Sequence, residues 1–191
     1  MNKIYQIIGK AIPLAMNDVD TDLIIPAQYL TAVTRAGFGE NLFKRLREGH
    51  PDFVFNQDKF KDANILITQS NFGCGSSREH AVWALQEAGI QAIIAESFAD
   101  IFFGNSAKNG LVLIKQPKET IQQMLDSAQD GNYQLNIDIE QQTMTSNKDE
   151  TYSFDIDPFR KHCFINGLND LDYLLSHMQQ IQDYEQRKRT L

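Results

Sequence analysis

Residues 64–95 read NILITQSNFGCGSSREHAVWALQEAGIQAIIA, and their pattern is typical of a βαβ unit. Asn64 to Gln69 is a short apolar run that predicts a buried strand, and Ile90 to Ala95 predicts a second one. Between them, Arg78 to Ala88 is rich in strong helix formers and is followed by Gly89. Because βαβ crossovers are almost always right-handed, we expect the loop before the helix at the carboxyl end of the first strand, where α/β proteins bind ligands.

The loop at 71–80, NFGCGSSREH, has the composition of an anion-binding turn. Gly73 and Gly75 permit a positive φ and a close approach of the backbone to a ligand. Ser76 and Glu79 have the spacing of a capping box, which predicts Ser76 as the N-cap of the helix with free N–H groups beside it. Such a terminus attracts a carboxylate or a phosphate. The alternative is that Ser76 only caps the helix, and the spacing alone leaves both open.

Arg78, in the expected first turn, would add a bidentate contact to an anion. Arg78 also occupies the position at which a GxGxxG motif needs its third glycine. A Walker A loop is absent as well, because no lysine follows the glycines, so neither nucleotide-binding motif is present. Cys74 and His80 permit a thiol nucleophile as a further hypothesis, although the sequence identifies no third group to orient the pair. The alternative for Cys74 is a small, half-buried residue in a turn.

The sequence offers no metal site of its own. Asp18, Asp20 and Asp22 have the spacing of the first EF-hand ligands, but the sixth loop position is Leu23 and the twelfth is Tyr29, which excludes that loop. The four histidines share no close spacing. We therefore expect this chain to bind no metal.

Composition narrows the class of protein further. The chain has 191 residues, of which 42% are hydrophobic, so we expect one globular domain spanning residues 1–191. A net charge of -7 argues against a nucleic-acid partner, and no stretch approaches the ~20 apolar residues needed to cross a membrane.

The first 16 residues lack the apolar core of a signal peptide. Cys74 and Cys163 are the two cysteines, and we expect them reduced in the cytoplasm.

The remaining elements are predicted from periodicity. Before the βαβ unit we expect a weak first strand at 3–14, an acidic turn that leads into an apolar run at 17–26, and a short helix at 40–47. After it, the α/β alternation continues with a Phe-rich connection at 98–109, a strand at 111–115 and a helix at 118–129. The Phe-rich segment 98–103 could form an interface, but core is the favoured interpretation. Alternating residues at 133–140 and 152–156 then predict an antiparallel hairpin around the polar turn TSNKDE.

The C-terminus predicts helices. Asp157 and Pro158 suit the N-cap and first position of one helix. A second is expected at about 169–188, with an apolar stripe that we expect in the core: Leu171, Leu174, Leu175, Met178 and Ile181. The fold class predicted from the residues is α/β, with a βαβ core and an antiparallel hairpin.

Basic residues gather after Tyr29, and a solvated helix face is the favoured interpretation of Lys44, Arg45 and Arg47. Arg35 differs because it lies in a glycine-containing loop ahead of that helix. We therefore keep Arg35 as a candidate anion contact.

NFGCGSSREHA resembles the family of 3-isopropylmalate dehydratase small subunits, which is similar to the swivelling C-terminal domain of aconitase. The resemblance covers nearly the whole chain, in family order. Its other blocks are DVDTDLIIP at 18–26, TRAGFGENLF at 34–43, PDFVFN at 51–56, ESFADIFFGNS at 96–106 and FRKHCFINGL at 159–168.

The resemblance implies a three-layer β/β/α swivelling domain and a hydro-lyase step of leucine biosynthesis. In that step 2-isopropylmalate, a small dicarboxylate, is dehydrated and rehydrated to 3-isopropylmalate. It also implies a large partner subunit that carries a [4Fe-4S] cluster. Two cysteines are too few to ligate such a cluster, so the iron is expected on the partner.

The resemblance also implies roles for particular residues. Ser76 matches the family's catalytic base, an alkoxide, and Arg78 matches its substrate-carboxylate arginine. Ser77 and Arg35 are expected as further substrate contacts. Supporting roles fall to Asp22, which would orient the cationic site, and to the two loop glycines, Gly73 and Gly75.

Two alternatives remain open from the sequence. Thr31, Ala32 and Ala36 depart from the family pattern in the loop that contacts the substrate's side group. A small subunit of a citraconate, dimethylmalate or homoaconitate hydratase is therefore a competing assignment. A non-catalytic α/β module that binds an anion at the same helix terminus is the other.

Overall fold

The computed structural model describes residues 1–30 and 37–189 and contains one mixed sheet of seven strands in the order β4-β3-β2-β1-β5-β6-β7. The strands are β1 Gln6–Leu14, β2 Ala63–Thr68, β3 Ala92–Ala95, β4 Val112–Lys115, β5 Gln134–Asp138, β6 Thr143–Ser146 and β7 Thr151–Ser153. β1 to β4 run parallel, whereas β5 to β7 form an antiparallel meander. The predicted α/β class is confirmed.

β1 joins the two halves of the sheet. Its first residues, Gln6 to Lys10, pair antiparallel with β5, and Lys10 to Leu14 pair in parallel with β2. A register shift between Lys10 and Ala11 separates the two pairings. Because a bulge bends a strand and increases its twist, the sheet curls at this point and folds over itself.

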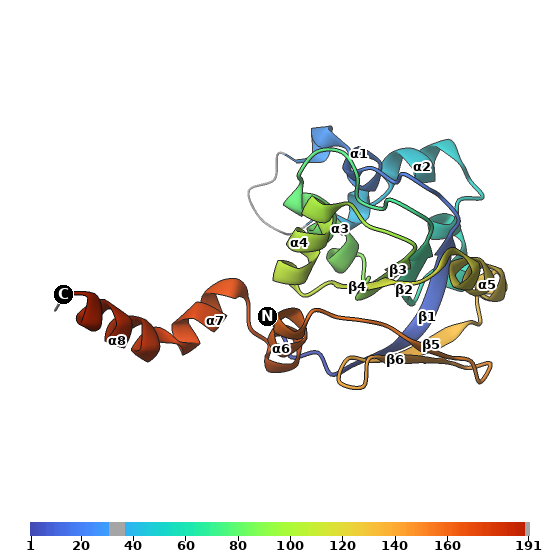
Figure 1. The fold of residues 1–191 in the computed structure, drawn as a ribbon. Helices are drawn as coiled ribbons and strands as arrows, with labels where there is room; N and C mark the ends of the chain where they lie inside the picture. The colour runs from blue at the N-terminus through green and yellow to red at the C-terminus, as the bar shows by residue number, and fades with distance from the viewer. Residues whose placement is uncertain (31–36, 190–191) are drawn as a thin grey trace.

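The curled sheet produces three layers, with the parallel strands in the middle (Figure 1). Figure 1 shows helices α1 to α4 on one side of these strands and β5 with β6 on the other. Neighbouring residues of the middle strands alternate between two cores: Leu66 and Ile93 belong to the helical side, and Ile65 and Ala92 to the meander side. The β/β/α arrangement implied by the resemblance is confirmed.

Both predicted strands and the helix of the βαβ unit are present, as β2, α3 and β3. The α-helices are α1 Thr21–Ile24, α2 Lys44–Gly49, α3 Glu79–Glu87, α4 Asp100–Asn109, α5 Lys118–Ala128, α6 Pro158–Asn166, α7 Asp170–Ser176 and α8 Met178–Arg189. Short 3-10 turns lie at Ala27–Tyr29, Gly39–Asn41, Val54–Asn56 and Asp58–Phe60. Among the described residues, no helix combines the length and the apolar character that a membrane crossing requires.

The segment 98–109, predicted as a connection, contains helix α4. Its sequence carries Gly104 and two asparagines, which have low helix propensity. Tertiary packing outweighs that preference: Phe102 is buried in the helical-side core and stacks edge-on against Phe72 at 5.4 Å. Gly110, at φ +81°, ends the helix.

The predicted hairpin is wrong in its pairing, because an extra strand lies between its two arms. β5 pairs with β6, and β6 pairs with β7, so the segment TSNKDE contributes to β6 and to the turn after it. Only Met144 in β6 belongs to the apolar core, which explains why alternation did not reveal the strand. Glu150 closes the turn by accepting hydrogen bonds from the hydroxyls of Ser146 and Tyr133, each at 2.9 Å.

Two predictions near the N-terminus also need correction. The segment 17–26 contains the short helix α1, capped by the Asp20 side chain, which accepts a hydrogen bond from the Leu23 N–H at 2.7 Å. The helix expected from Glu40 begins only at Lys44, because Phe43 has φ +51°. Phe43 is fully buried against the rings of Phe53 and Phe55, and this packing holds its unusual backbone.

The C-terminal stripe is not in the core. The region expected as one helix contains α7 and α8, and the stripe's side chains are 36–63% exposed: Leu171, Leu174, Leu175, Met178 and Ile181. Figure 1 shows α7 and α8 extending away from the sheet and its helices. The predicted cap of α6 is confirmed, since the Asp157 side chain accepts from the Arg160 N–H and Pro158 is the first helical residue.

Replacement of Met144 by alanine tests the assignment of β6. Met144 is fully buried between the two halves of the sheet, so Met144→Ala should lower the free energy of unfolding by about 2–4 kcal/mol. Thr145→Ala, one residue along the same strand on its exposed face, should change it by no more than about 0.5 kcal/mol. Urea unfolding measures both. Equal effects of the two substitutions would contradict the assigned register.

Candidate active site

The glycine-rich loop is held between two other segments of the chain. On one side Gly73 N–H donates to Val19 and Thr21 N–H donates to Cys74, at 2.8 and 2.9 Å. On the other side Phe72 N–H donates to Ser97 and Ala99 N–H donates to Phe72, at 3.1 and 3.0 Å. These backbone bonds place the loop at the carboxyl ends of β1, β2 and β3, as the βαβ unit predicts.

The two glycines adopt the backbone conformation that we predicted. Gly73 has φ +80° and Gly75 has φ +88°. At Gly73 a Cβ atom would lie 2.2 Å from Cγ of Phe102, so the loop and α4 approach each other more closely than any other residue permits. At Gly75 there is more space, and the positive φ alone favours glycine.

Ser76 is not the N-cap of the following helix, which corrects the predicted capping box. α3 begins at Glu79 with Arg78 at its N-cap, in extended conformation and without a side-chain cap. The Glu79 carboxylate instead accepts a hydrogen bond from the Asn109 amide at 2.8 Å. The loop before Arg78 is held by α1, where the Thr21 hydroxyl donates to the Ser76 carbonyl at 2.9 Å.

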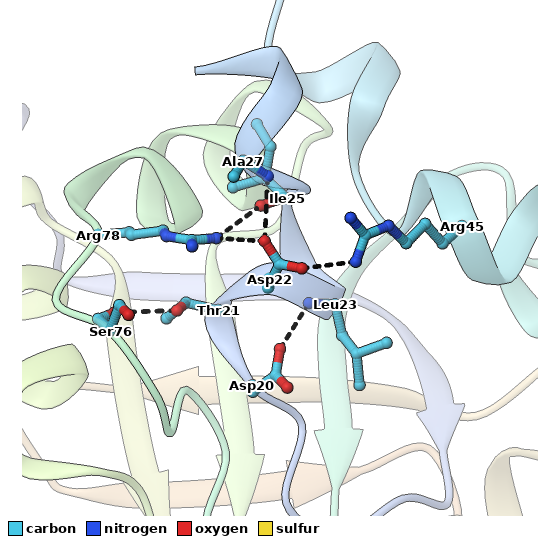
Figure 2. Close-up of polar contacts among 9 residues, drawn as sticks. All are labelled: Asp20, Thr21, Asp22, Leu23, Ile25, Ala27, Arg45, Ser76 and Arg78. Atoms are coloured by element: carbon cyan, nitrogen blue, oxygen red, sulfur yellow. Dashed lines mark hydrogen bonds and ion pairs between the residues drawn. The ribbon is translucent and has the colours of Figure 1, made fainter.

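Asp22 is the centre of a small charged cluster (Figure 2). Its carboxylate accepts hydrogen bonds from Arg78 Nη1 at 2.7 Å, from Arg45 Nη1 at 2.5 Å and from the Ala27 N–H at 3.0 Å. The Arg78 contact is the largest of the influences that lower the pKa of Asp22 to about 2, followed by the Ala27 N–H. Asp22 therefore stays ionised and fixes the guanidinium of Arg78.

The loop and the start of α4 enclose a pocket of about 270 Å³. The loop contributes Ser76, Ser77 and Arg78 to its lining, together with both glycines. The start of α4 contributes the N-cap Ala99 and the first turn, Asp100 to Phe102. The helix terminus that lines this pocket is therefore that of α4, whose first turn also carries the Asp100 carboxylate. The first N–H groups of a helix carry a partial positive charge, which favours an anion.

Within the pocket, both the serines and the arginine have unused hydrogen-bonding capacity. The hydroxyls of Ser76 and Ser77 are exposed and form no hydrogen bond with any residue in 1–30 or 37–189. Both hydrogen bonds that the Arg78 side chain makes with the described residues use Nη1, to Asp22 and to the Ile25 carbonyl. Nη2 and Nε remain for a ligand, and a carboxylate suits them.

The structure does not support Cys74 as a nucleophile. Partial burial, followed by the charges of Asp20 and Asp18, raises the pKa of the Cys74 thiol, so the reactive thiolate is disfavoured. His80 packs its ring edge-on against Trp83 and Phe38, at 4.8 and 5.2 Å between centroids. The pair therefore lacks the environment of a thiol–imidazole nucleophile.

Arg35 falls outside the described residues, so its candidate role stays a prediction. The chain just after it is fixed by Glu87, whose carboxylate accepts hydrogen bonds from the Gly37 and Gly39 N–H groups at 2.6 and 2.8 Å. These bonds lower the pKa of Glu87.

Arg45, which we interpreted as part of a solvated helix face, contacts Asp22 instead. This contact depends on how residues 17–26 pack against α2, so the sequence alone could not have revealed it.

The described residues contain no group of three or more His, Cys, Asp or Glu side chains arranged to hold a metal ion. Cys74 and Cys163 are both free, and Cys163 is buried in α6, far along the sequence from the loop. The donor set of these residues does not fit an iron–sulfur cluster.

Comparison with known proteins agrees with this fold and loop. The family model described as the aconitase C-terminal domain matches residues 1–119, and a second model, LeuD_N, matches residues 122–158. The 3-isopropylmalate dehydratase small subunit of Francisella tularensis subsp. novicida is 50% identical over 189 residues, 99% of this chain and 100% of the relative. That of Paramagnetospirillum magneticum is 45% identical over 196 residues, covering 100% and 98%. A crystal structure of 3-isopropylmalate dehydratase (leuD) from Methanocaldococcus jannaschii has a TM-score of 0.70 and 30% identity, covering 94% of this chain and 99% of that one.

The curled β/β/α sheet and the glycine-rich loop are those of an aconitase C-terminal domain, and the model of that family spans more than half of the chain. Relatives that match over full length define the group more narrowly. The chain belongs to the 3-isopropylmalate dehydratase small subunit family.

The charged cluster predicts a dependence of stability on pH. Because the pKa of Asp22 is lowered from 3.8 to about 2, its contribution is present above about pH 4 and is lost as pH falls through 2. Asp22 and Arg45 are partly exposed, so solvent screening limits the contribution to about 1 kcal/mol. Asp22→Asn should therefore destabilise the protein at pH 5 and progressively less at pH 3, measured by urea unfolding. Asp62→Asn, at an exposed residue, should have little effect; a constant Asp22→Asn deficit at both pH values would contradict the ion pair.

Proposed function

We propose that this chain supplies the base and a carboxylate-binding arginine to the reversible dehydration of 2-isopropylmalate. Its family makes it a subunit of a hydro-lyase of leucine biosynthesis. The observation that carries the proposed division of roles is that Ser76 and Arg78 line one pocket, with Arg78 held by Asp22. The substrate is a small dicarboxylate, and a pocket of about 270 Å³ suits its size.

In the proposed reaction, Arg78 binds a carboxylate through its remaining N–H groups, and Ser76 takes the proton from the adjacent carbon. The electron pair of that C–H bond forms the double bond as hydroxide leaves the neighbouring carbon. Rehydration with the opposite placement of hydrogen and hydroxyl gives 3-isopropylmalate. The guanidinium of Arg78 favours negative charge and therefore supports a deprotonated Ser76. At α4 the partial positive charge of the helix terminus is opposed by the Asp100 carboxylate, which also lines the pocket.

Departure of hydroxide calls for a Lewis acid, which a [4Fe-4S] cluster supplies when bound. The described residues of this chain do not fit such a cluster, so we assign it to a large subunit. The pocket then lies at or near the surface where the two subunits meet. We place the assembled enzyme in the cytoplasm, in agreement with two cysteines that are both free.

Ser76→Ala tests the base. In the assembled enzyme it should lower kcat by about 10²–10⁴-fold, the usual contribution of a positioned base, and leave binding of the substrate nearly unchanged. Initial rates with 2-isopropylmalate and calorimetric titration of the same variant give the two quantities. Ser127→Ala, in α5 on another part of the molecule, serves as the control and should have wild-type rates. A near-normal kcat in Ser76→Ala would remove Ser76 from the chemistry.

Co-purification with the large subunit tests the two-chain assignment. We expect the isolated chain to be inactive even after iron–sulfur reconstitution, and the reconstituted pair to convert 2-isopropylmalate in preference to other 2-alkylmalates. Turnover by the isolated chain would contradict the division of roles. A preference for citraconate, dimethylmalate or homoaconitate would change the assigned substrate and leave Ser76 assigned as the base. Binding without turnover would indicate a non-catalytic anion-binding module.

A further inference from the structure

The pocket has two walls of opposite charge. Arg78 on the loop is positive and Asp100 in the first turn of α4 is negative, and these are the charged side chains in the described lining of the pocket. An ionised carboxylate carries a full negative charge, whereas the start of a helix is equivalent to only about half a positive one. The α4 wall therefore keeps a net negative charge and disfavours a carboxylate, while the loop wall attracts one.

Asp100 is not neutralised by the part of the chain that the structure describes. Its side chain is exposed, and it accepts no hydrogen bond and forms no ion pair with residues 1–30 or 37–189. Asp22, by contrast, is engaged by Arg78 and Arg45. The negative charge of Asp100 is therefore available to act on a ligand in the pocket.

Ile101 adds an apolar contact to the same wall. Its side chain lines the pocket and is 55% exposed. The next residue, Phe102, is buried instead against Phe72 and Gly73, which fixes the start of α4 relative to the loop. An alkyl group placed against Ile101 removes apolar surface from water on both partners, which favours binding.

The α4 wall is open on the side that carries these two residues. Gly104 lies three residues after Ile101 and four after Asp100, so the three positions share one face of the helix. A Cβ atom at Gly104 would meet nothing within 4 Å beyond its chain neighbours and the helix backbone. The side group of a ligand can therefore reach Asp100 and Ile101 without displacing another element.

The side group is also where the candidate substrates differ. Departures from the family pattern at 31–36 leave two classes open: an alkyl side group, as in 2-isopropylmalate, and one with a third carboxylate, as in the homoaconitate class. We propose that Asp100 and Ile101 select between these classes, accepting the alkyl group and rejecting the carboxylate. The proposal rests on the proposed function, in which Arg78 binds a carboxylate that both classes share. The isopropyl group then lies against Ile101, where a third carboxylate would meet the like charge of Asp100.

Inhibition of the assembled enzyme by homocitrate tests the role of Asp100. Homocitrate carries a carboxyethyl group where 2-isopropylmalate carries isopropyl. Asp100→Asn keeps the size of the side chain and removes its charge, so the ratio of Ki for homocitrate to KM for 2-isopropylmalate should fall about tenfold. Glu119→Gln, which removes an acidic residue from the first turn of α5 outside the pocket, is the matched control and should keep the wild-type ratio.

Salt provides a second measurement that needs no substitution. Because ions screen the repulsion between charges, raising the salt concentration should lower the same ratio for the wild type and change it much less for Asp100→Asn. A role of Asp100 in helix stability alone would give the two proteins the same salt dependence of this ratio.

Ile101→Ala tests the apolar contact. It should lower kcat/KM for 2-isopropylmalate relative to 2-methylmalate, whose side group is shorter, by about tenfold. Ile8→Ala, at an exposed apolar residue of β1 outside the pocket, is the control and should leave this preference unchanged.

Three results would count against the proposal. An unchanged ratio in Asp100→Asn, or an unchanged preference in Ile101→Ala, would remove that residue from substrate selection while turnover of 2-isopropylmalate kept the proposed function intact. Unchanged selectivity together with weaker capture of the large subunit would make the α4 wall a subunit contact instead. Failure of the wild-type pair to convert 2-isopropylmalate would overturn the proposed function and this selection with it.

Discussion

Attachment of the glycine-rich loop to residues 18–22 is the constraint on which the site depends. The Thr21 hydroxyl and the Asp22 carboxylate hold the loop at Ser76 and Arg78, and α3 begins only at Glu79. Had the helix begun at Ser76, that residue's side chain would have capped its own helix. Because the helix starts later, Ser76 instead lines the pocket, and its hydroxyl has no partner among the described residues.

The same attachment explains how an acidic protein forms a cationic site. The chain has a net charge of -7, so recognition of an anion depends on local geometry. Asp22 does not neutralise Arg78 fully, because it engages only Nη1 and shares its own charge with Arg45. The first turn of α4 also lines the pocket and brings the positive end of a helix together with the Asp100 carboxylate. Three segments distant in the sequence therefore build one electrostatic environment.

The curl of the sheet relates the site to the remainder of the molecule. Because β1 pairs with β2 through one half and with β5 through the other, the meander folds beneath the parallel strands and buries their second face. The helical face is then left to support the loop and α4. Helices α7 and α8 follow α6 and extend away from the body, so an apolar stripe that resembles core is exposed.

Sequence alone determined the βαβ unit, the glycine conformations, the cap of α6 and the family, because each depends on local backbone preference or on a run of characteristic residues. It misplaced the start of α3 and missed α4 and β6, because long-range contacts outweighed propensity at Ser76, Phe102 and Met144. Only the tertiary structure could show that Arg45 joins Asp22, that α4 provides the helix terminus of the pocket, and that the C-terminal stripe is uncovered. Periodicity identifies an apolar face, but the surface that covers it is a property of the folded molecule.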